Sequence, residues 1–141
     1  EVNGGMMFQG NAEYTLDAKN RLFIPVKIRE QVGDSFILFL PPREKCLYIY
    51  SEARWEEVAR EVLAKNDRGY ERLIFGNAVT AETDKQGRIT IRADFCKRIG
   101  LKKSVTIAGT GERLEIWDTA TRNEELARLA ESADTYSDIR F

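Results

Sequence analysis

Two short segments of the sequence share one arrangement, an aspartate followed four residues later by an arginine. They read Asp17-Ala18-Lys19-Asn20-Arg21 and Asp84-Lys85-Gln86-Gly87-Arg88. Arginine offers a planar fork of donors to guanine or phosphate, and lysine offers a point charge to the DNA backbone. Because each arginine directly follows a predicted tight turn, it should project from a rigid edge of the fold. Six basic residues are therefore candidates for contact with a nucleic acid, two in each segment and two on an adjoining short helix: Lys19, Arg21, Lys85, Arg88, Lys27 and Arg29.

A second interpretation of these segments is structural. Each aspartate could pair with the arginine of its own segment and brace the turn, while the lysines are ordinary solvated charges. Because a carboxylate beside a phosphate is repulsive, we favour bracing for Asp17 and Asp84. We favour DNA contact for Arg21, whereas Arg88 suits DNA and an interface between subunits equally well. For the two basic residues of the short helix, phosphate contact and a merely solvated face both stay open.

The same two aspartates are the best available candidates for catalysis, as a shared acid and base pair. Against this, the sequence has no histidine, no nucleophile motif and no glycine-rich phosphate loop before a helix. The arginine four residues after each aspartate would also keep the carboxylate ionised. Cys46 and Cys96 are isolated, so we expect them in the core and not in a zinc site. We expect no enzyme activity, no metal, no cofactor and no small-molecule substrate.

Composition limits both the fold and the partners. With 141 residues, 43% of them hydrophobic, the chain can bury one shared core but hardly two independent ones. Lys and Arg (22) nearly cancel Asp and Glu (23), so any nucleic-acid surface must be local. Residues 17–30 hold four basic and two acidic residues, whereas 112–141 hold four basic and eight acidic ones. The longest apolar run covers only 36–40, and no signal segment opens the chain, so we expect a cytoplasmic protein without a membrane partner.

An internal repeat organises the chain. Residues 17–24 lie over 84–91, and 47–50 lie over 114–117 at the same offset. Each copy predicts four short strands, at 12–16, 22–24, 36–40 and 46–50 and then at 79–83, 89–91, 105–108 and 114–117. Asn20 and Gly87 occupy turn positions suited to positive φ.

Helices are predicted between and after these strands. A short helix follows the second strand of each copy, from Pro25 to Gly33 in the first and from a cap at Asp94 to Gly100 in the second. A helix capped by Ser51 should bury a stripe of apolar residues: Trp55, Val58, Ala59, Val62 and Leu63. Further helices at 69–75 and 120–132 should turn six more inward: Tyr70, Leu73, Ile74, Leu126, Leu129 and Ala130.

The predicted organisation has five parts. Residues 1–6 look like an expression remnant, 7–52 and 76–120 are the two half-modules, and 53–75 are linking helices. Residues 121–141 are a C-terminal helix and tail, of which 133–141 should be loosely ordered unless a neighbouring subunit holds it.

Several of these motifs together resemble the MraZ family. The first signature is matched by Gly10, Tyr14-Thr15-Leu16-Asp17-Ala18-Lys19-Asn20-Arg21-Leu22 and Ile24-Pro25-x-Lys27. The second signature and the end strand are matched by Asp84-x-x-Gly87-Arg88-Ile89-x-Ile91 and Leu114-Glu115-Ile116-Trp117-Asp118. The resemblance covers about 7–120. Asn20 stands where glycine is common, and Arg92 stands where the second copy often has proline.

The resemblance implies a mainly β fold with packed helices (α+β), in which two tandem AbrB-like half-modules form one pseudo-dimeric swapped-hairpin β-barrel. It also implies a transcription regulator on the nucleoid that binds double-stranded DNA as a homo-oligomeric ring. The DNA contacts that it implies are Lys19 and Arg21 in the first motif and Lys85 and Arg88 in the second, with Lys27 and Arg29 as flanking basic residues. Its targets would be repeated promoter boxes upstream of the division and cell-wall gene cluster. Arg92 removes the helix-starting proline from the second copy, so the two half-sites are not expected to be equivalent. The alternative is an antitoxin-like or other AbrB-fold module whose acidic C-terminal helix binds a basic partner protein.

Overall fold

The computed structural model describes residues 7–132 and 138–139 and is an α+β fold. All eight predicted strands form, each within one residue of its predicted bounds: β1 (Asn11–Thr15), β2 (Arg21–Phe23), β3 (Ser35–Phe39), β4 (Cys46–Ser51), β5 (Ala78–Glu82), β6 (Arg88–Thr90), β7 (Ser104–Gly109) and β8 (Leu114–Asp118). Five helices accompany them in this part of the chain: α1 (Val26–Val32), α2 (Glu52–Leu63), α3 (Arg68–Phe75), α4 (Ala93–Arg98) and α5 (Thr119–Ala130). None of these helices is long and apolar enough to cross a membrane.

The strands form two antiparallel sheets that mix the two copies of the repeat. Six strands lie in the order β1-β7-β8-β4-β3-β5, and β2 pairs with β6 as a separate two-stranded ribbon. The first strand of each copy thus pairs with the third strand of the other copy. Because β1 and β5 end the six-stranded sheet without pairing with each other, the described strands form an open sheet, and the predicted closed barrel is not found.

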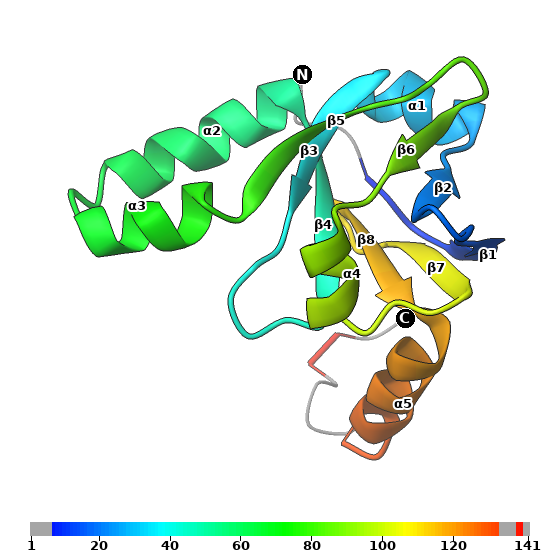
Figure 1. The fold of residues 1–141 in the computed structure, drawn as a ribbon. Coiled ribbons are helices and arrows are strands. Elements are labelled where there is room, and N and C mark those ends of the chain that lie inside the picture. Colours follow the sequence, from blue (N-terminus) through cyan, green and yellow to red (C-terminus); the bar gives the residue numbers. More distant parts are fainter. Residues whose placement is uncertain (1–6, 133–137, 140–141) are drawn as a thin grey trace.

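The sheet order maps onto itself when the two copies are exchanged. Under an offset of 67 residues, β1 corresponds to β5, β2 to β6 and α1 to α4. Helix α2 corresponds to α5 in the same way, because both have 12 residues and begin directly after the fourth strand of their copy. The chain is therefore a pseudo-two-fold unit in which each described element except α3 has a counterpart in the other copy (Figure 1).

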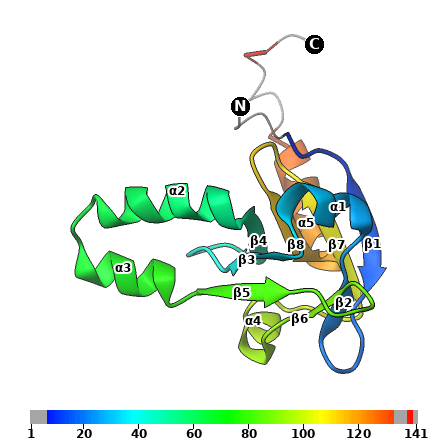
Figure 2. The same ribbon diagram turned by 90° about the horizontal axis from the view of Figure 1, so that it is seen from above.

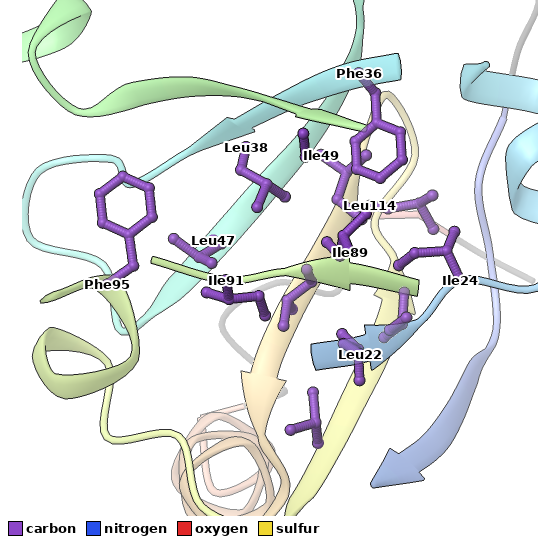
Figure 3. Packing of buried hydrophobic residues seen from close by; sticks show 14 of the residues in the cluster. Leu22, Ile24, Phe36, Leu38, Leu47, Ile49, Ile89, Ile91, Phe95 and Leu114 are labelled. Atoms are coloured by element: carbon purple, nitrogen blue, oxygen red, sulfur yellow. The ribbon is translucent and has the colours of Figure 1, made fainter. Parts of the chain in front are cut away.

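One large core joins the two copies. The inner side of the ribbon contributes Leu22, Ile24, Ile89 and Ile91, each at most 1% exposed. These side chains pack in one cluster with Phe36, Leu38, Leu47 and Ile49 of β3 and β4 (Figure 3). Burying a side chain of this size contributes about 1.5–3 kcal/mol, so the ribbon is held firmly against the sheet.

A smaller second cluster lies under α2 and α3. Phe39 of β3 packs there with Val62 and Ile74, and the Trp55 ring centroid lies 5.2 Å from that of Phe39. The two helices form a hairpin that extends away from the body of the molecule (Figure 1).

Several residues predicted to be inward are exposed instead. On the α2–α3 hairpin these are Leu63 (51%), Tyr70 (41%) and Leu73 (45%), and on α5 they are Leu126 (44%) and Leu129 (37%). The apolar stripes of these helices are wider than the surface that the sheet offers them. Apolar side chains therefore face outward on the α2–α3 hairpin and on α5.

The start of α4 also differs from the prediction. Arg92 is the residue that precedes the helix, and no side chain caps it. Asp94 lies in the first turn and pairs with Arg92 through contacts of 2.6 and 2.8 Å. The guanidinium carbon of Arg92 also lies 4.3 Å from the ring centroid of Phe95. An ion pair and a ring contact therefore occupy the place where the first copy has Pro25.

Candidate nucleic-acid interface

The first signature turn is held by the carboxylate of Asp17. Its Oδ1 accepts hydrogen bonds from the backbone amides of Lys19 (2.9 Å) and Arg21 (2.8 Å). Its Oδ2 accepts one from Nε of Arg21 at 2.6 Å. One carboxylate thus fixes both the backbone of the turn and the inner edge of the arginine side chain.

The second signature turn repeats this arrangement. Oδ1 of Asp84 accepts hydrogen bonds from the amides of Gln86 and Arg88, both at 2.9 Å, and Oδ2 accepts one from Nε of Arg88 at 3.0 Å. The predicted bracing role of both aspartates agrees with this geometry. Bracing and DNA contact are compatible, because among the described residues no hydrogen bond engages the two terminal nitrogens of either arginine.

Both turns use a left-handed residue just before the arginine. Asn20 has φ 60° and Gly87 has φ 78°, as the sequence predicts. At Gly87 space is also short, because a Cβ there would lie 3.1 Å from Nη2 of Arg29 and 3.1 Å from Cε1 of Phe23. Glycine is therefore favoured in the second turn by its backbone conformation and by this close approach.

The electrostatics of the turns favour ionised carboxylates. The hydrogen bond from the Arg21 amide is the largest cause that lowers the pKa of Asp17 below its ordinary value. The Arg88 amide lowers the pKa of Asp84 in the same way. A pair of carboxyls that shares a catalytic proton needs one pKa raised, so these two groups lack the property that the catalytic hypothesis requires.

The two arginines lie on one exposed face of the ribbon. Strands β2 and β6 pair with Arg21 opposite Thr90, Leu22 opposite Ile89 and Phe23 opposite Arg88. Because Leu22 and Ile89 point into the core, the other four side chains point outward. We call this surface the ribbon face, and it consists of Arg21, Phe23, Arg88 and Thr90. Sequence reasoning missed Phe23 and Thr90, although their alternation with buried neighbours could have revealed them.

Among the remaining predicted contacts, the lysines stay at the surface. Lys19 and Lys85 are exposed within the two signature turns, at opposite ends of the ribbon. Lys27 is exposed as well, but it lines a groove of about 600 Å³ between the start of the described chain, β1 and α1. The structure thus groups Lys19 and Lys85 with the ribbon face and places Lys27 beside a different feature.

Arg29 does not belong to a solvated helix face. Its Nε donates to the carbonyl oxygen of Ile24 at 3.0 Å, and its Nη1 lies 3.7 Å from Oδ1 of Asp34. Its Nη2 faces Gly87 of the other copy. The side chain is only 23% exposed, and through these contacts it supports the inner side of the ribbon.

Comparison with known proteins agrees with the repeated architecture. The model of the family described as "MraZ protein, putative antitoxin-like" matches the chain twice, over residues 7–72 and 74–138. A "Transcriptional regulator MraZ" from Nitrosomonas europaea is 37% identical over 94% of this chain and 92% of its own length. A protein of the same name from Leuconostoc mesenteroides subsp. mesenteroides is 38% identical over 94% of this chain and 94% of its own length. With two copies of the family pattern, and relatives that match nearly end to end, the chain belongs to the MraZ family.

Proposed function

We propose that the protein is a sequence-specific DNA-binding transcription regulator that contacts the major groove through the ribbon face. The observation that carries this proposal is the matched pair of arginines, each held at Nε by its own aspartate and each with terminal nitrogens that no hydrogen bond engages within the described part of the chain. Two donors on a fixed planar fork suit paired acceptors such as O6 and N7 of guanine. The relatives' printed name, transcriptional regulator, supports the same conclusion.

The shape of the ribbon also fits this role. A two-stranded ribbon can enter the major groove, which is roughly 12 Å wide. Its inner side is anchored by four fully buried side chains, so it can present the arginines without reordering. Lys19 and Lys85 would contact phosphates at the two ends of the ribbon, which supplies the local positive charge that a chain of net charge −1 lacks overall.

We further propose that several copies assemble into a ring and bind repeated boxes upstream of the division and cell-wall gene cluster, on the nucleoid in the cytoplasm. The α2–α3 hairpin extends on the side of the molecule opposite the ribbon (Figure 1, Figure 2). Its outward apolar residues, Leu63, Tyr70 and Leu73, would be covered by a neighbouring copy. A ring that carries several ribbons, each of which binds DNA weakly, gains affinity for repeated boxes because bound ribbons raise the effective concentration of the others.

The antitoxin-like alternative rests on the acidic stretch 124–138, part of which lies outside the described residues. Within α5, Arg122 and Arg128 balance Glu124 and Glu125, so the helix is not acidic. Two other acidic residues of the C-terminal region are buried and serve the fold: Asp118 caps α5, and Glu115 accepts a hydrogen bond from the Trp117 indole at 2.8 Å.

A titration with DNA from upstream of the protein's own gene tests the proposed function. Fluorescence anisotropy should show tight, saturable binding to this duplex and at least tenfold weaker binding to a scrambled duplex of equal length. Arg21→Ala and Arg88→Ala should weaken the specific binding. Arg60→Ala removes the same charge from the exposed side of α2 and should leave binding unchanged. Equal binding to both duplexes would reject the proposal.

A further inference from the structure

The four residues of the ribbon face form two pairs that the pseudo-two-fold relation exchanges, and only one of these pairs consists of identical residues. The pseudo-two-fold relation exchanges residue 21 with 88 and residue 23 with 90, and its axis passes through the Leu22–Ile89 pair. Arginine occupies both positions of the first exchanged pair, 21 and 88. The remaining pair differs, because one position is Phe23 and the other is Thr90.

Phe23 is held in place on this face. One edge of its ring packs against Gly87, where even a Cβ would come within 3.1 Å of Cε1. The side chain is nevertheless 43% exposed, and this exposed part points to the same side as Arg21 and Arg88. An anchored ring beside two arginine forks is suited to apolar contact with a base edge.

Thr90 presents different chemistry in the equivalent place. It is exposed and offers a short side chain with a hydroxyl, which can hydrogen-bond to any base edge or to phosphate. The turns strengthen the asymmetry, since Lys19 corresponds to Gln86 and Lys85 corresponds to Ala18. A bound duplex would therefore meet two chemically distinct halves.

We infer that Phe23 is a specificity-determining residue that contacts a thymine methyl group in one half of the DNA site, and that its exchange for Thr90 in the other half gives the duplex a single orientation on the ribbon. Thymine is the base that presents a methyl group in the major groove, and this group is the natural partner of an exposed ring. This inference rests on the proposed function. It adds that the recognised sequence is not a palindrome, although the fold is close to two-fold symmetric.

Selection of binding sites from a random duplex pool provides the first test. The full-length wild-type chain should enrich a non-palindromic sequence with thymine in one half. Phe23→Thr should lose that thymine preference, and the exchange variant Phe23→Thr/Thr90→Phe should enrich the sequence read in the opposite direction. If the wild type enriches no sequence, the proposed function fails. If it enriches a palindrome, a sequence without thymine, or the same sequence as Phe23→Thr, only the present inference fails.

A methyl-deletion cycle tests the contact directly. Replacing the selected thymine by deoxyuracil removes one methyl group and should weaken wild-type binding about fourfold, the factor expected for one buried methyl. Phe23→Thr should bind the two duplexes equally, and deoxyuracil in the other half should leave wild-type binding unchanged. A fourfold loss that persists in Phe23→Thr would overturn the assignment. Thermal unfolding of Phe23→Thr serves as the folding control, because threonine is well suited to a strand.

Directed cleavage tests the orientation. Cys46 and Cys96 are both buried, so an iron chelate attached at Ala18→Cys, an exposed turn position, would report one end of the ribbon. On a duplex with a single selected site, cleavage should fall on one side for the otherwise wild-type chain and shift to the other side in the exchange variant. Equal cleavage on both sides, or an unshifted pattern in the exchange variant, would contradict the role of Phe23.

Discussion

Arg21 of β2 lies directly opposite Thr90 of β6, and the two side chains leave the ribbon on the same face. Arg88 and Phe23 stand in the same relation at the other end. The two arginines therefore occupy diagonal corners of one small surface. A duplex that engages one arginine is positioned to engage the other.

The first prediction is that Arg21→Ala and Arg88→Ala each weaken specific DNA binding by about 1–3 kcal/mol and relax the sequence preference. Their folds should persist, because the aspartates keep their hydrogen bonds to backbone amides. Anisotropy titrations measure the affinity. An effect at Arg21 alone would show that the second copy faces something other than DNA.

The second prediction concerns the lysines of the turns. Lys19→Ala and Lys85→Ala should weaken binding to specific and scrambled duplexes alike, and each should lower the slope of log K against log salt concentration by about one unit. Titrations at several salt concentrations measure the slope. Lys65→Ala, exposed between α2 and α3, is the matched control and should not change it. A selective loss of specific binding would mean that the lysines read bases.

The third prediction is a pH dependence of stability. The folded pKa values of Asp17 and Asp84 are lowered, so their stabilising effect is complete above the unfolded pKa of about 4 and is lost as the pH falls below it. Asp17→Asn/Asp84→Asn should therefore be less stable than wild type at neutral pH and should lose less stability on acidification.

Urea unfolding at a series of pH values measures this difference. Arg92 similarly lowers the pKa of Asp94, so part of the acid dependence should remain in the double variant. Parallel stability curves for the two proteins would show that the turn carboxylates are not coupled to folding.

The fourth prediction separates the two turns. Gly87→Ala should destabilise the protein by about 1–2 kcal/mol, because its φ of 78° disfavours a side chain and the added Cβ meets Arg29 and Phe23. Asn20→Gly should change stability by less than about 1 kcal/mol, since both residues tolerate the left-handed region. Chemical denaturation compares them. A neutral Gly87→Ala would mean that the second turn can rearrange.

The fifth prediction concerns assembly. Replacing Leu63 and Leu73 by serine should reduce the molecular mass measured by light scattering and should weaken binding to arrays of boxes more than binding to a single box. Leu126→Ser on α5 is the comparison. If only that variant dissociates the protein, the subunit contact lies on α5 and not on the hairpin.

The sequence was informative where a local signal decides the structure. Asn20 and Gly87 sit at a position where few residues are tolerated, and the strands around them alternate clearly, so the turns and strand bounds were predictable. Duplication doubled this evidence, because each motif could be checked against its counterpart 67 residues away.

The sequence was not informative where the position of a side chain depends on which other element it contacts. The apolar periods of α2, α3 and α5 identify helices, but they do not say how much of each stripe the sheet covers, and Leu73 and Leu126 remain outside. For Arg29 the sequence leaves open phosphate contact and a solvated helix face, because the other copy's Gly87 lies 58 positions away, where no local pattern can place it. The sequence predicts Asp94 as a helix cap, but in the structure its carboxylate pairs with the guanidinium of Arg92.

The exchange of strands between the copies has a consequence for synthesis on the ribosome. Strand β1 pairs with β7, and the side chains of Glu13 and Ser104 that meet across this pair are 91 residues apart. The N-terminal half therefore emerges from the ribosome with an unpaired strand and an incomplete apolar cluster. The strand can pair and the cluster can close only after nearly the whole chain has been synthesised. Nascent chains of this protein should accordingly gain protease resistance late and in a single step, not copy by copy.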